Sequence, residues 1–473
     1  MRFSIHAMVV PLAMVLAAGT ALAQQPETLR YANDNDYYAN DYYVMQDDVP
    51  SPSPSDAVPP TPSDDEAGDG EAACKLGCGE ILGCAPDCGG GGRGLRACRG
   101  GGLARCCNLG DPWELPVPCR LRCMGIEWGG WISHGYYTNA HGADDNGPVA
   151  FRDVGNEYTL NQLWFYAERT LDTENRGGID WGFRVDYVFG ADGPDTQAFG
   201  GHPGSWDNPW DSSDDGVYGS ALPQLYGEVG FGDLSVKFGH FYTLIGYEVV
   251  PAPDNFFTSY AYTMYFGEPF THTGVLAGYA VGENVTVYGG WTQGWDTGFD
   301  NTPGADTFLG GVRLTLTDDL AVTYATTWGD FGEDLGLGDI YMHSVVADLT
   351  LTDKLSYVFQ SDVAVNSLDA APDAEWYGVN QYLLYRWNEC WAVGMRFEWF
   401  RDDDGARIPG VFAGHFYEVT WGVNWRPHAN IVVRPELRYD WYDGPAGAGG
   451  ALPFNNGADD DQFSGGFDVI TTF

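Results

Sequence analysis

The sequence predicts an all-β protein: a transmembrane antiparallel β-barrel of about sixteen strands that follows an N-terminal extension. Three observations predict this fold. Short segments alternate apolar and polar residues from about residue 124 onward, short and long connections alternate between these segments, and the last segment ends on the aromatic residue Phe473. Strands of an outer-membrane barrel have this pattern because one face meets lipid and the other meets water.

Residues 1–23 are predicted to be a signal peptide for secretion. Arg2 supplies a positive start, Met8 to Ala18 form an apolar core, and Ala21-Leu22-Ala23 places small residues at a cleavage site. The core is too short to span a bilayer as a helix, and no later run approaches ~20 apolar residues. We therefore expect an exported chain without a helical membrane anchor.

Residues 24–73 are expected to be a disordered spacer rich in proline and aspartate. The segment contains Pro50-Ser51-Pro52-Ser53-Pro54 and Pro59-Pro60 among many aspartates. Such a composition buries too little apolar surface to offset the entropy cost of ordering.

Residues 74–123 form a cysteine-rich segment. In an exported protein, disulfides are the leading interpretation of such a cluster. The count is odd, so at least one thiol is free or pairs with Cys390 or with another chain. A zinc site is less favoured, because the C-x-x-C pairs of zinc ribbons are absent. The disulfide candidates are Cys74, Cys78, Cys84, Cys88, Cys98, Cys106, Cys107, Cys119 and Cys123.

Residues 124–473 are predicted to be the barrel. In Ile179 to Phe189, apolar and aromatic residues take every second position, and Asp180, Arg184 and Asp186 lie among the residues between them. Ile431 to Tyr442 shows the same division. This period of two is typical of strands with one polar and one apolar face.

A soluble β-sandwich also alternates, and two details favour the barrel over it. Tryptophans stand at strand ends, as in interfacial girdles; they are Trp181, Trp391, Trp399, Trp425 and Trp441. The connections also differ in length. Tight ones are expected at 232–233, 317–319 and 427–429, and long ones at 191–220, 297–306 and 402–414.

The predicted barrel is strongly acidic, with 50 acidic and 14 basic residues from residue 124 onward. Nucleic-acid binding is excluded as a function, because neutralising phosphates needs a basic surface. In a pore, excess carboxylate would raise the local concentration of cations.

Several stretches resemble a known family, the OmpL-like β-barrel porins abundant in planctomycete bacteria. They are Asn161–Arg169, Leu222–Gly274, Glu375–Tyr382, Arg396–Gly405 and Trp425–His428. The resemblance covers most of 125–473 and is most specific in 222–274, whereas the cysteine-rich segment lies outside it. It implies a pore in the bacterial outer membrane and carries over no catalytic residue.

The segment Tyr242 to His272 interrupts the strand pattern. It is too apolar for a loop that is exposed to water, so we expect a partner surface for it. Our hypothesis is a constriction loop that folds into the lumen and narrows the pore; the alternatives are a loop packed over the barrel mouth or a subunit contact. Candidate constriction residues are Asp254, Asn255, Phe256, Phe257 and Glu268.

Charged residues at inward-facing positions would set the selectivity of the pore. The alternative is that neighbouring opposite charges only neutralise one another on the wall. The pore-lining candidates are Arg184, Asp186, Glu228, Lys237, Arg396, Glu398, Glu418, Arg434, Glu436, Arg438 and Asp440.

No metal site or cofactor is predicted. Three aspartate-rich loops, 211–216, 402–405 and 459–461, could offer oxygen ligands to Ca²⁺, but none has the EF-hand spacing, and solvated turns are the preferred interpretation. No G-x-S-x-G or H-E-x-x-H motif is present. We therefore predict that the protein is not an enzyme.

Together these features predict a passive diffusion channel for small hydrophilic solutes or ions, with a preference for cations. Its expected partners are outer-membrane lipid, the solutes and, in a homo-oligomer, further copies of the chain. The alternatives are a structural or adhesive barrel with a plugged lumen and, less favoured, a barrel hydrolase.

Overall fold

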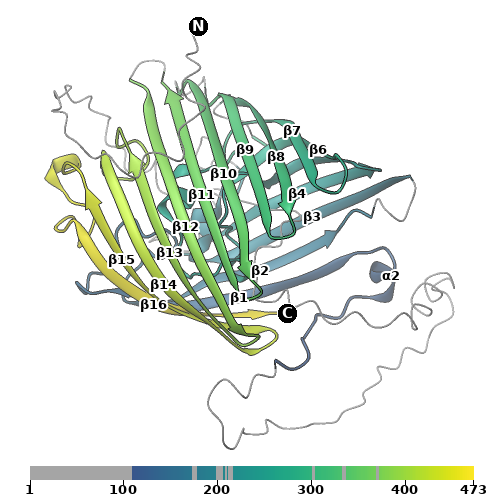
Figure 1. Ribbon diagram of the computed structural model, residues 1–473, viewed down its shortest axis with the longest axis horizontal. Coiled ribbons are helices and arrows are strands. Elements are labelled where there is room, and N and C mark those ends of the chain that lie inside the picture. The colour runs from purple at the N-terminus through teal and green to yellow at the C-terminus, as the bar shows by residue number, and fades with distance from the viewer. Residues whose placement is uncertain are drawn as a thin grey trace, which may run out of the picture. The chain divides into compact units, whose positions relative to one another are not determined.

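The computed structural model describes residues 109–172, 178–198, 206–207, 210, 217–300, 304–332, 337–368 and 372–473. Sixteen antiparallel strands close into one barrel in which every strand pairs with its sequence neighbours (Figure 1). The predicted fold class and strand number are confirmed.

The strands are β1 (Glu127–Asn139), β2 (Glu157–Arg169), β3 (Ile179–Gly190), β4 (Gly219–Phe231), β5 (Leu234–Tyr242), β6 (Thr271–Ala280), β7 (Val285–Thr292), β8 (Asp306–Thr317), β9 (Leu320–Asp330), β10 (Asp339–Thr352), β11 (Leu355–Ser367), β12 (Ala374–Asn388), β13 (Trp391–Asp402), β14 (Gly414–His428), β15 (Ile431–Asp443) and β16 (Asp461–Thr472). The short helices are α2 (Cys119–Arg122), α3 (Asp192–Thr196), η3 (Ala252–Asp254), η4 (Thr263–Gly267) and η6 (Ala448–Gly450). Among the described residues, no helix is long and apolar enough to cross a membrane.

The barrel closes where β1 pairs with β16, in a register that runs from Trp131 opposite Thr472 to Asn139 opposite Ser464. The terminal residue extends this ladder: Phe473 N donates to Gly130 O at 2.9 Å, and Gly130 N donates to Phe473 O at 3.0 Å. Closure leaves no strand edge unpaired, which a lipid environment requires.

The alternation in the sequence corresponds to the two faces of the barrel wall. On β3, Asp180 and Asp186 are buried on the inner face, whereas the outward-facing Ile179 and Trp181 are 75% and 46% exposed. Aromatic rings also gather on the outer face, as the sequence predicts. The stacked Trp391 and Trp425, whose ring centroids lie 5.7 Å apart, are one example.

Short turns and long loops lie at opposite ends of the barrel. The tight connections at 232–233 and 317–319 are confirmed, and Gly232 adopts φ +55°, a conformation that favours glycine. Long connections after β3 and β13 are also confirmed. Short turns belong to the periplasmic end and long loops to the extracellular end.

Residues 109–126 form a strap along the short-turn end of the barrel. Asn430 holds both backbone groups of Trp113, accepting from its N–H at 2.6 Å and donating to its carbonyl at 2.9 Å. Arg169 Nε donates to Met124 O at 2.8 Å. The strap therefore fixes the C-terminal end of the cysteine-rich segment to the barrel.

Two disulfide candidates, Cys119 and Cys123, lie at α2 and are exposed. The other seven lie outside the described residues, as do the signal peptide, the spacer and residues 211–216. The assignments of these segments and the cysteine pairing stay predictions.

Candidate functional site: the loop inside the barrel

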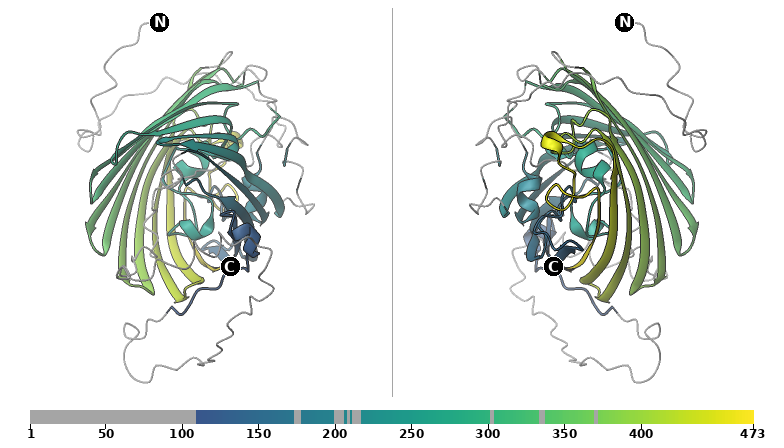
Figure 2. Two further views of the ribbon diagram at one scale, coloured as in Figure 1. Left: turned by 90° about the vertical axis from the view of Figure 1, so that its right-hand side faces the viewer. Right: turned by 90° about the vertical axis from the view of Figure 1, so that its left-hand side faces the viewer.

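The connection between β5 and β6, residues 243–270, does not extend away from the barrel. Figure 2 shows its teal segment, with η3 and η4, inside the ring of strands. The predicted interruption of the strand pattern is confirmed, since β5 ends at Tyr242 and β6 begins at Thr271. We call residues 243–270 the inner loop.

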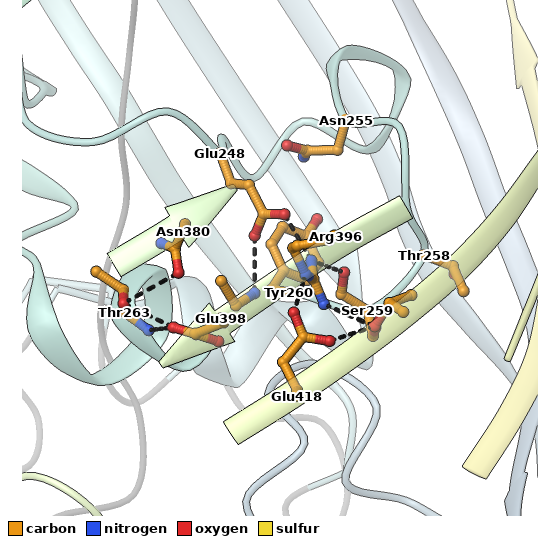
Figure 3. Close-up of polar contacts among 12 residues, drawn as sticks. Glu248, Asn255, Thr258, Ser259, Tyr260, Thr263, Asn380, Arg396, Glu398 and Glu418 are labelled. Carbon is orange, nitrogen blue, oxygen red and sulfur yellow. Dashed lines mark hydrogen bonds and ion pairs between the residues drawn. The ribbon is translucent and has the colours of Figure 1, made fainter. Parts of the chain in front are cut away.

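Carboxylates on the barrel wall bind backbone N–H groups of the inner loop (Figure 3). Glu398 of β13 accepts from Tyr262 N at 2.6 Å and from Thr263 N at 2.5 Å. Glu436 of β15 accepts from Thr258 N at 2.7 Å. Buried amides without such acceptors would cost free energy, so these two residues supply partners that the irregular loop cannot supply itself.

Arginines on the same wall bind carbonyl groups of the inner loop. Arg434 donates to Asn255 O at 2.6 Å, and Arg438 donates to Tyr260 O at 2.6 Å. Arg396 donates to Ser259 O at 2.9 Å (Figure 3). Side chains of β13 and β15 therefore bind both the N–H and the carbonyl groups of the loop backbone.

Each of these arginines is also neutralised by buried carboxylates. Arg396 lies 2.5 Å from both Glu248 of the loop and Glu418 of β14. Arg434 pairs with Asp468 at 2.6 Å, a contact between side chains that are 2% and 1% exposed. Removing one partner of such a pair leaves a buried charge without compensation, which costs about 3–5 kcal/mol.

The end of the inner loop is fixed by a carboxylate from another loop. Asp296, between β7 and β8, accepts from Phe270 N and Thr271 N, each at 2.8 Å. Burial raises the pKa of Asp296 well above its ordinary value, and these backbone hydrogen bonds oppose that rise.

Apolar packing completes the attachment on the same wall. Two glycines at inward-facing positions, Gly394 of β13 and Gly422 of β14, leave room for the loop's Phe256 and Phe257. A Cβ at Gly422 would lie 2.9 Å from a ring carbon of Phe257, and a Cβ at Gly394 would collide with Phe256. The inner face of β13 and β14 is therefore complementary in shape to this part of the inner loop.

The opposite side of the inner loop also has partners. Gln162 of β2 donates to Val250 O at 2.7 Å, and Tyr265 Oη donates to Asp195 of α3 at 2.8 Å. Contacts with β2 and α3 on one side and with β13–β15 on the other mean that the loop reaches across the interior.

Comparison with known proteins identifies the barrel. Residues 125–473 match the model of the family described as "Putative beta-barrel porin-2, OmpL-like". The chain belongs to this porin family. No curated protein sequence matches the chain significantly. The family and the fold place this porin in the bacterial outer membrane.

Two solved structures share the fold of the porin. An anion-selective porin from Comamonas acidovorans is 9% identical, with a TM-score of 0.53, over 74% of this chain and 99% of that one. The outer membrane channel DcaP of Acinetobacter baumannii is 12% identical, with a TM-score of 0.50, over 74% of this chain and 97% of that one. At such identities the likeness concerns the fold alone.

The eleven pore-lining candidates of the porin all take inward-facing positions, but they fall into two groups. Eight are buried: Asp186, Arg396, Glu398, Glu418, Arg434, Glu436, Arg438 and Asp440. Seven of these contact the inner loop or one another, whereas Asp186 accepts hydrogen bonds from Trp164, Arg184 and Gln224. Arg184, Glu228 and Lys237 are partly exposed. Contact with pore water stays a prediction, and the structure favours it for the second group.

Sequence reasoning missed other partly exposed residues on the inner face of β7, β8 and β10. Tyr288, Arg313 and Asp348 lie there. The same alternation rule could have found Arg313, which lies between Val312 and Leu314 in β8. Sequence reasoning also missed Glu248 and Arg152, which donates to Thr258 of the inner loop at 3.3 Å. These two residues carried no sequence signal, because their partners are distant in the chain.

The five constriction candidates differ in their contacts and in their exposure. Phe256, Phe257 and Glu268 attach the inner loop to the wall, and Asn255 binds backbone groups within the loop, accepting from Val249 N at 2.9 Å. Asp254 is exposed at the end of η3. Of the five, Asp254 is therefore the one exposed side chain.

Filling the space beside Gly394 is expected to dislodge the inner loop. In a Gly394→Val variant the added side chain occupies the position of Phe256, and such overpacking costs about 1–3 kcal/mol. Urea unfolding in detergent should show this loss. Gly289→Val is the matched control, because its Cβ points outward from β7 and meets its nearest neighbour, Phe308, at 3.8 Å. Equal stability of the two variants would contradict the assigned packing.

Proposed function

We propose that this porin is a passive diffusion channel for small hydrophilic solutes or ions, and that the inner loop narrows its lumen. The carrying observation is the set of hydrogen bonds by which Arg396, Glu398, Arg434, Glu436 and Arg438 hold the loop backbone against β13 and β15. A loop held in this way is a fixed constriction, and transport then needs only a gradient and a pore of suitable width and charge.

The proposed passage lies between the inner loop and the inner face of β3, β5, β8 and β10. Side chains that are not buried face this space from both sides: the exposed Asp254 from the loop, and the partly exposed Arg184, Lys237, Arg313 and Asp348 from the strands. Both signs of charge are present, so polar solutes would be oriented as they pass.

The proposed selectivity is a preference for cations. Its support is the excess of carboxylates over basic residues in the barrel and the exposed Asp254 on the loop. A reversal potential measured across a salt gradient tests this part separately, and an anion preference would overturn it without affecting the channel itself.

Swelling of liposomes that contain the purified porin tests the channel. We expect rapid swelling with small sugars and progressively slower swelling as the sugar grows, because a fixed constriction sets a size limit. Liposomes that do not swell with any sugar would overturn the proposal.

The second candidate is a structural barrel whose lumen the inner loop plugs. Apolar packing on two sides favours it: Tyr262 and Phe266 join one buried cluster with Trp376 and Phe400, while Tyr260 and Met264 join another with Trp164. A plugged barrel would release no solute in the swelling assay. We also propose that the porin forms a homo-oligomer and catalyses no reaction.

Alkaline pH is expected to loosen the inner loop at Glu268. This buried residue accepts a hydrogen bond from Gln360 of β11, and burial together with the charge of Asp362 raises its pKa well above the ordinary value. Because the folded-state pKa is raised, the protonated form stabilises the folded loop, and this stabilisation is lost as pH rises through that pKa.

Single-channel recording across neutral to alkaline pH measures this loosening. Current fluctuations should increase with pH in the wild-type porin and stay flat in Glu268→Gln, which cannot ionise. Glu283→Gln, on the exposed turn between β6 and β7, is the control and should behave as the wild type does. The same pH response in both variants would contradict the role of Glu268.

A further inference from the structure

A row of aromatic side chains lies on the outer face of the barrel near the long-loop ends of β13, β14 and β15. We call Trp399, His415, Tyr417, Tyr439 and Trp441 the outer aromatic row. Its members face away from the lumen, because they alternate with the buried inward residues Phe400, Phe416, Glu418 and Asp440. The pairing register places Trp399 opposite Tyr417 and Tyr417 opposite Trp441.

The rings of this row are nearly parallel to one another. Tyr417 and Trp441 stack with centroids 5.0 Å apart and planes at 8°. His415 stacks with both Trp399 and Tyr417, at interplanar angles of 22° and 20°. Tyr439 continues the row beside Trp441. The row thus crosses three strands as one ordered surface.

Polar groups surround the row. Trp399 Nε1 donates to His415 Nδ1 at 2.9 Å, and Arg401 contacts both His415 and Asp403. Tyr439 Oη donates to Asp461 at 2.6 Å. Beside these residues lies a shallow pocket of about 360 Å³, lined by Tyr439, Trp441, Tyr442, Asp460 and Asp461.

The position of the row constrains its partner. Long loops mark the extracellular end of an outer-membrane barrel, so an outward-facing surface there meets the headgroup region of the outer leaflet. Aromatic rings with polar tips suit such a boundary. A purely anchoring belt, however, needs neither a basic side chain nor a pocket flanked by carboxylates.

The charges favour an uncharged headgroup over a phosphate. Asp403, Asp460 and Asp461 outnumber Arg401 at this surface, and like charges would repel an anion. Sugar hydroxyls both donate and accept hydrogen bonds. They can therefore donate to the carboxylates of this surface and accept from the side chain of Arg401. We propose that the outer aromatic row and its pocket bind the uncharged sugar headgroup of a glycolipid in the outer leaflet.

Native mass spectrometry of the full chain tests this proposal. The porin is purified in an amine-oxide detergent, which has no sugar headgroup to compete, and mixed with monogalactosyl diacylglycerol or with phosphatidylglycerol. We expect the wild type to retain the galactolipid in preference to phosphatidylglycerol. The Tyr417→Ala/Trp441→Ala double variant should retain roughly tenfold less galactolipid.

The matched control is Trp291→Ala/Trp328→Ala, which removes two exposed outward-facing rings elsewhere on the barrel, 47% and 56% exposed. This control should retain the galactolipid as the wild type does, and the heat-dependent gel mobility of both double variants verifies folding. Preferential retention of phosphatidylglycerol, with or without Mg²⁺, would overturn the proposal. An equal loss of galactolipid in the two double variants would overturn it as well.

Discussion

Deleting Pro253–Gly267 is expected to raise the single-channel conductance of this porin by roughly twofold or more, because the conductance of a pore follows its narrowest section. The deletion removes most of the segment that Glu398, Glu436 and the wall arginines hold inside the barrel. Planar-bilayer recording of the refolded deletion variant, compared with the full chain, measures the effect.

Tyr158→Ala controls for changes that come from refolding and insertion. Tyr158 is 58% exposed near the start of β2, away from the inner loop, and its substitution should leave the conductance unchanged. If the deletion also leaves the conductance unchanged, the inner loop does not form the constriction.

Replacing Arg396 with methionine is expected to lower the free energy of unfolding by about 3–5 kcal/mol. The change leaves Glu248 and Glu418 buried without their positive partner and removes the donor to Ser259 O. Urea unfolding of the variant in detergent or lipid measures the loss.

Arg401→Met is the matched control on the same strand. Arg401 faces outward, and its ion pair with Asp403 is about one-third exposed, at 31% and 35%. Such exposed pairs contribute about 0–1 kcal/mol, so this variant should stay close to the wild type. Similar losses in both variants would contradict the stabilising role of the buried cluster.

The barrel itself was predictable from the sequence because its strands and turns are determined by residues that are close together in the chain. A strand in a bilayer must alternate, since lipid and water lie on its two sides, and β3 follows this rule from Ile179 to Tyr187 and β15 from Val433 to Trp441. Turn lengths are equally local: Gly232-Asp233 is a tight turn in the sequence and in the structure. The interruption at the inner loop was predictable for the same reason, because its apolar residues lack the period of two.

The surroundings of the inward-facing charges were not predictable. Alternation tells which face of the wall Arg396 or Glu436 occupies, but it does not tell what covers that face. Arg396 meets Glu248 across 148 positions of sequence, and Glu436 meets Thr258 across 178. Contacts of this separation follow from the path of one loop inside the barrel, and a single sequence has no local signal for that path.

The role of the N-terminal extension was only partly predictable. The cysteines indicated a segment that is cross-linked by disulfides. Their pattern did not indicate that Asn430 and Arg169 bind the strap and hold it against the barrel. Arg169 lies 45 residues from Met124 in the sequence, and Asn430 lies 317 residues from Trp113. Composition alone could not identify partners at such separations.

Planar-bilayer recording of the intact porin tests the central claim most directly. The claim is that a passage remains beside the inner loop, between Asp254 and the inner face of β3, β5, β8 and β10. It predicts discrete ion-current steps after insertion of the full-length protein, with a conductance that is stable at neutral pH. Insertion of folded protein without any current steps would contradict the channel and favour the plugged barrel.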